Sequence, residues 1–117
     1  MKLIFVSGRY SGSCYTETED NIMNARTAAL QLYSKGWAVI TPHLNTAHFD
    51  SHDRLTNMNE RKWYKVYKEI LSRCDAIFMI GNWLTSAGAK TEHDFAKEKG
   101  ITIFYESNGF PSLGDIN

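Results

Sequence analysis

The sequence predicts a doubly wound α/β fold, in which a parallel sheet of about four strands is covered by helices on both faces. Four short apolar runs contain no charged residue and are rich in β-branched and aromatic side chains, as is typical of strands buried on both faces. Segments with the period of amphipathic helices lie between these runs. Strands and helices therefore alternate, which predicts a Rossmann- or flavodoxin-like sheet with right-handed crossovers.

The four runs end at residues that are common in turns. Ser7, Pro42 and Gly81 follow the first three runs, and Gly100 precedes the fourth. The predicted strands are residues 3–6, 38–41, 76–80 and 101–105.

Three helices are predicted between the strands, at residues 18–35, 59–73 and 87–99. Gly36 and Gly100 follow the first and third of these segments and act as C-terminal stop signals. Residues 42–57 are predicted to form a long irregular connection, and connections of this length are often functional. The tail from Ser107 onward is also predicted to be irregular.

Length and charge restrict the class of protein. A chain of 117 residues fits a single domain, residues 1–117. Its 13 basic and 13 acidic side chains cancel, so no net charge favours nucleic acid or an anionic membrane as a partner. The first apolar run is too short for a signal peptide, and no run approaches the roughly 20 residues of a membrane span. Because Cys14 and Cys74 lie in no metal-binding spacing, we expect reduced thiols in a soluble, cytoplasmic protein.

The loop after the first strand is a candidate anion site, because ligands of such sheets bind at the carboxyl ends of the strands. It combines two glycines with hydroxyl groups just before a helix, a combination that can bind phosphate. The loop matches neither GxGxxG nor the P-loop pattern, and a plain turn between strand and helix is an equally good interpretation. Its residues are Ser7, Gly8, Arg9, Tyr10, Ser11 and Gly12.

The most informative residue is Glu92. With about 100° per residue, the third predicted helix places Glu92 on the same face as Ala89 and Phe95, which should pack on the sheet. A buried carboxylate is costly unless it is paired or lies in a cavity, so Glu92 is a candidate catalytic group. The alternative is a structural carboxylate that accepts a hydrogen bond from a loop amide. Ser86 at the start of the helix can cap it, bind phosphate, or do both.

Three segments together resemble the nucleoside 2-deoxyribosyltransferase-like superfamily, especially its short phage and bacterial members. The likeness to the deoxynucleoside 5′-monophosphate N-glycosidases is more distant. The resemblance covers about residues 2–105. It rests on Ser7-Gly8-x-x-Ser11-Gly12, on Cys74-Asp75-Ala76 and on Gly81-x-Trp83-x-x-Ser86-x-Gly88-Ala89-x-x-Glu92.

The resemblance implies an enzyme that cleaves the bond between base and sugar. Glu92 would attack the anomeric carbon to form a glycosyl ester, which water or a second base then resolves, as in a retaining glycosidase. Ser86 and the loop residues Ser7 to Gly12 would hold the 5′-phosphate, with Arg9 as the one cation of the loop. Tyr10 would stack on a base or bond the nucleophile. We expect no cofactor and no metal. The resemblance implies a homo-oligomer, a dimer or larger, with sites completed by a neighbour.

One position departs from the family pattern. The family usually has an aspartate eight residues before the aspartate that matches Asp75, and the corresponding residue here is Tyr67. A phenol with a pKa near 10 can bond Glu92 or a sugar hydroxyl, but it is a poor acid at neutral pH. Tyr67 is therefore a second candidate catalytic residue that puts turnover in question. We expect Asp75 to join a helix to a strand rather than to act in chemistry.

Other polar and aromatic residues near the predicted site allow more than one interpretation. His43 ends the second strand and can contact the base or act as the missing acid. His43, His48 and His52, with Asp50 and Asp53, match no metal-ligand spacing, and their segment is interpreted as a solvated loop. Trp83 can stack on a base or seal the loop against the core. Asn82 and Gly88 are further candidates for substrate binding, and His93 is expected to be structural.

Three functions remain open at this point. The first is an N-glycosidase or 2-deoxyribosyltransferase that acts on nucleoside 5′-monophosphates. The second is a non-catalytic nucleotide-binding module. The third is a hydrolase of another N-glycoside, such as NAD.

Overall fold

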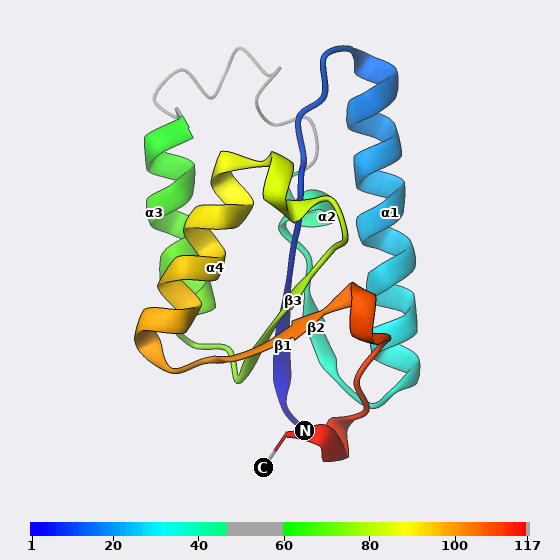
Figure 1. The fold of residues 1–117 in the computed structure, drawn as a ribbon, viewed down its shortest axis with the longest axis vertical. Helices are drawn as coiled ribbons and strands as arrows, with labels where there is room; N and C mark the ends of the chain where they lie inside the picture. Colours follow the sequence, from blue (N-terminus) through cyan, green and yellow to red (C-terminus); the bar gives the residue numbers. More distant parts are fainter. Residues whose placement is uncertain (47–59, 117) are drawn as a thin grey trace.

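The computed structural model describes residues 1–46 and 60–116 and contains a single parallel sheet (Figure 1). Its strands pair in the order β2-β1-β3-β4, and every neighbouring pair is parallel. The predicted fold class is therefore confirmed, and each strand lies within one residue of its predicted ends. The strands are β1 (Leu3–Ser7), β2 (Ala38–Ile40), β3 (Ala76–Met79) and β4 (Thr102–Tyr105).

The helices follow the prediction with two corrections. Residues 42–57 do not begin as an irregular connection, because Pro42 starts a short helix whose first position suits the fixed φ of proline. The tail is not wholly irregular either, since it contains two 3-10 turns, η4 (Glu106–Asn108) and η5 (Leu113–Asp115). The helices are α1 (Tyr15–Ser34), α2 (Pro42–Asn45), α3 (Glu60–Leu71) and α4 (Ala87–Lys99), and a 3-10 turn, η3 (Trp83–Thr85), precedes α4.

The strand order places a switch point at the centre of the sheet. From β1 the chain passes through α1 to β2, and it then returns across the sheet to β3. Figure 1 shows α1 on one side of the sheet and α3 with α4 on the other. The chain therefore leaves β1 and β3 toward opposite faces, which opens a crevice at their carboxyl ends.

Two hydrophobic layers cover the sheet, one on each face. Ile4, Val6 and Phe78 pack in the layer that contains α1, whereas Phe5 and Ile77 pack in the layer that contains α3 and α4. This alternation is the two-residue period of strands buried on both sides. No helix of the described residues has the length and apolar character needed to cross a membrane.

The C-terminal tail completes the layer on the α1 side. Phe110 stacks on Phe78 with ring centroids 5.2 Å apart, and the Trp37 indole donates a hydrogen bond of 2.9 Å to the Pro111 carbonyl. Asp75 joins the starts of two strands, because its carboxylate accepts the backbone N–H of Leu3 at 2.8 Å. The tail thus packs against the core although its only regular elements are two 3-10 turns.

The residue that ends α4 adopts a left-handed backbone conformation, and this requirement can be tested by substitution. Gly100 has φ +74°, and a side chain there would contact nothing within 4 Å, so only the left-handed backbone disfavours other residues. We expect Gly100→Ala to lower the free energy of unfolding by about 1 kcal/mol in urea denaturation. Gly114→Ala is the matched control, because Gly114 is equally unobstructed and has no positive φ. Equal effects of the two substitutions would contradict this explanation.

Candidate active site

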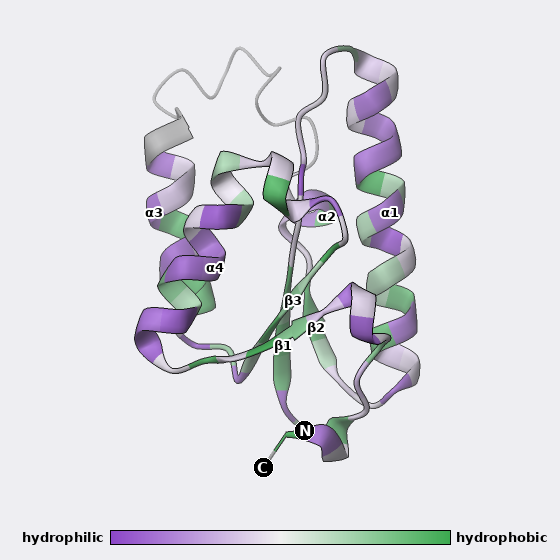
Figure 2. Ribbon diagram, in the orientation of Figure 1, coloured by the Kyte–Doolittle hydropathy of each residue, from purple (hydrophilic) through white to green (hydrophobic). Residues whose placement is uncertain are grey.

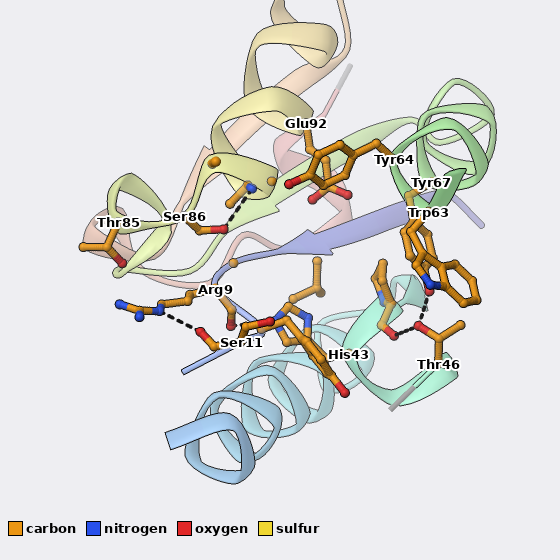
Figure 3. A pocket seen from close by; sticks show the side chains of 17 residues that line it. Arg9, Ser11, His43, Thr46, Trp63, Tyr64, Tyr67, Thr85, Ser86 and Glu92 are labelled. Carbon is orange, nitrogen blue, oxygen red and sulfur yellow. Dashed lines mark hydrogen bonds between the residues drawn. The ribbon is translucent and has the colours of Figure 1, made fainter. Parts of the chain in front are cut away.

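A cleft of about 670 Å³ lies at the carboxyl ends of β1 and β3, where the switch point predicts it. Four segments line it: the loop after β1, the α2 region, the start of α3 and the first half of α4. Figure 3 shows that the cleft has two ends. Arg9, Ser11 and Ser86 lie toward one end, and Trp63 and Tyr67 lie toward the other.

Glu92 is the acidic residue among those lining the cleft. It lies on the second turn of α4, and its Oε1 accepts a hydrogen bond of 2.6 Å from the Ser7 hydroxyl at the end of β1. Burial raises the pKa of Glu92 to about 7, and the Ser7 hydroxyl partly opposes this shift because it stabilises the charged form. The carboxyl group can therefore exist in either protonation state near neutral pH.

The start of α4 and the loop after β1 form the polar end of the cleft. Ser86 caps α4, since its hydroxyl accepts the backbone N–H of Ala89 at 3.1 Å. The Arg9 Nε donates a hydrogen bond of 2.8 Å to the Ser11 carbonyl, which holds the base of the guanidinium against the loop. Arg9 and Ser86, at the N-terminus of α4, line the same cleft, and a cation together with a helix N-terminus favours anions.

The Tyr67 hydroxyl, for which the sequence suggested Glu92 or a sugar hydroxyl as a partner, bonds a residue at the end of α2. Its hydroxyl is hydrogen-bonded to the Thr46 hydroxyl, and its ring stacks on Trp63 with centroids 5.8 Å apart. Burial raises the pKa of Tyr67, and the nearby Glu92 carboxylate adds to the shift. Tyr67 is therefore neutral at neutral pH, and its hydroxyl is a weaker acid than that of a free tyrosine.

Tyr64 lines the cleft and was not identified from the sequence. A Cβ on Gly88 would lie 3.1 Å from the Tyr64 Cε1 atom and 3.3 Å from its hydroxyl oxygen, so a glycine lets the ring pack on α4. Thr46, Trp63 and Thr85 also line the cleft without having been assigned a role there.

His43 lines the cleft as predicted, and one of its ring nitrogens bonds the loop after β1. It is buried, and its Nε2 lies 2.9 Å from the Arg9 carbonyl, which can only accept, so Nε2 carries the proton. Burial lowers the pKa of His43, so the ring is neutral at pH 7 and a poor acid. Its edge-on contact with Tyr10, 5.8 Å between centroids, further ties α2 to the loop after β1.

Several predicted residues lie outside the cleft lining. Ser7 is connected to the cleft by the hydrogen bond from its hydroxyl to Glu92. The Gly12 amide donates to the Thr18 hydroxyl of α1 at 3.1 Å. Trp83 stacks on His93 with centroids 4.4 Å apart, and Asn82 donates to the side chain of Asn21 at 3.3 Å. The interpretation of Trp83 as a seal against the core thus fits its position.

The remaining candidates concern metals and thiols. His48, Asp50, His52 and Asp53 lie outside the described residues. Within residues 1–46 and 60–116, no group of three or more potential ligands is arranged to hold a metal ion. Both cysteines are free thiols.

Comparison with known proteins places most of the chain in one family. Residues 2–105 match the family described as "Domain of unknown function (DUF4406)", so the chain belongs to this family. No curated protein matches the chain. The loop after β1, α3 and Glu92 all lie within the matched residues.

The protonation of Glu92 should be visible in the stability of the protein. A carboxyl group with a pKa near 7 in the folded state and 4.5 in the unfolded state stabilises the fold below pH 4.5, and this contribution is lost as the pH rises to 7. We expect Glu92→Gln, which cannot ionise, to gain ~2–3 kcal/mol relative to wild type between pH 4.5 and pH 8. Urea denaturation at a series of pH values measures this difference. Glu98→Gln, on the exposed side of the same helix, is the control, and an identical pH response of the two variants would exclude a buried Glu92 charge.

Proposed function

Because the description of the DUF4406 family assigns no activity, we propose a function from the cleft itself: cleavage of the base–sugar bond of nucleoside 5′-monophosphates, with Glu92 as nucleophile. The observation that carries this proposal is the Glu92 carboxyl group, buried beside Ser7 at the carboxyl end of the central strand. A carboxylate with little solvation, facing a cavity, is the group that covalent glycosidic cleavage requires. The sequence resemblance to the nucleoside 2-deoxyribosyltransferase-like superfamily supports the same assignment.

The two ends of the cleft fit the two ends of a nucleotide. At the polar end, Arg9 and the N-terminus of α4 at Ser86 suit a 5′-phosphate, through charge and helix dipole together. At the other end, the stacked rings of Trp63 and Tyr67 supply apolar surface for a base. Glu92 lines the same cleft, so a sugar bridging the two ends can reach its carboxylate.

The chemistry follows from these positions. The Glu92 carboxylate forms an ester bond with the anomeric carbon while the bond from that carbon to the base nitrogen breaks, and the electron pair leaves with the base. A water molecule, or a second base, then attacks the same carbon and releases the carboxylate. The Ser7 hydroxyl donates to Oε1 and holds the carboxylate in place before attack.

A non-catalytic nucleotide-binding module is the second candidate, and the orientation of Tyr67 favours it. Protonation of a departing base needs an acid, whereas the Tyr67 hydroxyl is bonded to Thr46 and its pKa is raised. A cleft that lacks such an acid still binds a nucleotide, but the bond from the sugar to a neutral base is then cleaved slowly. The same observation makes NAD a useful test substrate, because its nicotinamide leaves without being protonated.

The proposal is tested by measuring base release. The protein is incubated with each deoxynucleoside 5′-monophosphate, with the matching nucleosides and with NAD, and free base is measured by chromatography. We expect release from a 5′-monophosphate in preference to its nucleoside, a loss of about a thousandfold or more in Glu92→Ala, and no loss in Glu98→Gln.

A 2-fluoro-sugar substrate should also leave a covalent adduct on Glu92, detected by mass spectrometry. Tight nucleotide binding without base release, in wild type and Glu92→Ala alike, would show that the protein is a nucleotide-binding module and not an enzyme.

The pH dependence should report on the ionisation of Glu92. Because the carboxylate is the reactive form, we expect kcat/KM for base release to rise tenfold per pH unit below about 7 and to level off above it. Ser7→Ala removes the hydrogen bond that lowers this pKa, so the bend in the profile should move to higher pH. A profile that stays in place in Ser7→Ala would show that another group controls the rate.

A further inference from the structure

The charges of the cleft have opposite signs at its two ends. Of the described residues that line it, the acidic and basic ones are Arg9, His43 and Glu92, and the His43 ring is neutral at pH 7. Arg9 lies at the polar end (Figure 3). The Glu92 carboxylate acts on the aromatic end, because its charge contributes to the raised pKa of Tyr67. The cleft therefore offers a cation to one end of a ligand and an anion to the other.

The charge of the Glu92 carboxylate is weakly screened. A hydrogen bond of 2.6 Å from the Ser7 hydroxyl stabilises it, and the side chains of Phe5, Met79 and Ala89 pack in the apolar layer on the same face of the sheet. Figure 2 shows the central strands beneath the cleft as hydrophobic. Apolar surroundings screen a charge less than water does, so the carboxylate acts strongly on any charged group placed at the aromatic end.

The walls of the aromatic end suit a flat cation. Trp63 and Tyr67 line it as a stacked pair, with ring centroids 5.8 Å apart and planes inclined by 17°. The face of an aromatic ring carries partial negative charge and attracts a cation. A flat base with a positive charge is thus attracted by the ring faces and by the Glu92 carboxylate together, whereas a neutral base has the ring faces alone.

The hydrogen bonds of the cleft favour a base that leaves without receiving a proton. The Tyr67 hydroxyl is bonded to Thr46, and the Nε2 proton of His43 is donated to the Arg9 carbonyl at 2.9 Å. A cationic base needs neither proton. When the Glu92 carboxylate forms its ester with the anomeric carbon, the bond to the base breaks and its electron pair neutralises the base. Water then hydrolyses the ester.

We infer that the ligand of this cleft is a nucleoside 5′-monophosphate whose base carries a positive charge, as pyridinium bases and N7-alkylated purines do. The places of the phosphate and of the nucleophile in this inference rest on the proposed function. The substrate class is new, because a negative phosphate and a positive base match the two ends of the cleft. A nucleotide with a neutral base leaves the charge of Glu92 without a counterpart.

Binding of such a ligand should be coupled to the ionisation of Glu92. A positive base beside the carboxyl group favours its charged form, so binding lowers the pKa of Glu92 from about 7 and releases protons. The affinity for a cationic ligand should therefore rise about fourfold between pH 6.5 and pH 8. The other titratable side chains that line the cleft are Arg9, His43 and three tyrosines, Tyr10, Tyr64 and Tyr67. Two ligands that differ in the charge of the base, and share the phosphate, separate the effect of Glu92 from theirs.

Isothermal titration calorimetry with carbocyclic nicotinamide mononucleotide provides this comparison. A methylene group replaces the ring oxygen of its sugar, which prevents cleavage, and its reduced form has a neutral base of nearly the same shape. We expect the cationic form to bind about tenfold more tightly than the reduced form at pH 8. The fourfold rise in affinity with pH should occur for the cationic form alone. The same pH response for both forms would overturn the inference.

A variant pair and a second ligand pair sharpen the test. Glu92→Gln should reduce the preference for the cationic form to about threefold or less, whereas Glu98→Gln, on the exposed side of α4, should retain it. Circular dichroism checks that both variants are folded, and the pH response of wild type tests the inference without any variant. An undiminished preference in folded Glu92→Gln would overturn it. The 5′-monophosphates of 7-methylguanosine and guanosine, compared at pH 6.5, distinguish alkylated purines from pyridinium bases as the preferred class.

The binding results can be separated from the proposed cleavage. A preference for the cationic member of either pair, with no release of base, would support this inference and contradict the cleavage. Base release from neutral nucleotides, together with equal affinities within both pairs, would support the cleavage and overturn this inference.

Discussion

β1 and β3 pair in parallel at the centre of the sheet, and the chain leaves their carboxyl ends toward opposite faces. This pairing determines where the cleft can form, because the connections that follow the two strands diverge instead of covering the sheet edge. It also brings Ser7, the last residue of β1, beside Glu92 of α4, which are 85 residues apart in sequence. The candidate nucleophile and its hydrogen-bond donor thus depend on a strand register that is set by buried apolar residues far from either.

Burial of Glu92 opposes the stability of the fold. The charged form is poorly solvated, as the rise of its pKa to about 7 indicates, and one hydroxyl group from Ser7 only partly offsets this. Two apolar layers and the docked tail provide the stability that allows one unfavourable group at the sheet edge. Poor solvation also leaves a carboxylate more reactive toward an electrophilic carbon, so the destabilisation and the proposed chemistry have the same physical origin.

The sequence was sufficient to predict what depends on periodicity and much less informative about side-chain partners. Uncharged apolar runs and helical phase predicted all four strands, both ends of α4 and the inward position of Glu92. They did not predict that Tyr67 bonds Thr46 or that Tyr64 packs over Gly88. These contacts join α3 to segments that are distant in the sequence, and a local pattern does not show which distant segments meet. Trp83 was ambiguous for the same reason, since its stacking partner His93 lies ten residues further on, along α4. The helix at Pro42 was not predicted, although proline in the first turn is a start signal for helices. The length of the segment favoured an irregular connection.

Helix α1 positions one end of the cleft from outside it. Its first turns hold the loop after β1 through the Thr18 hydroxyl, which accepts the Gly12 amide, and through Asn21, whose side chain donates to the Tyr10 carbonyl at 3.1 Å. Tyr10 lines the cleft, whereas Thr18 and Asn21 do not. The position of the loop at the polar end of the cleft therefore depends on hydrogen bonds from a helix that contributes no residue to the cleft lining.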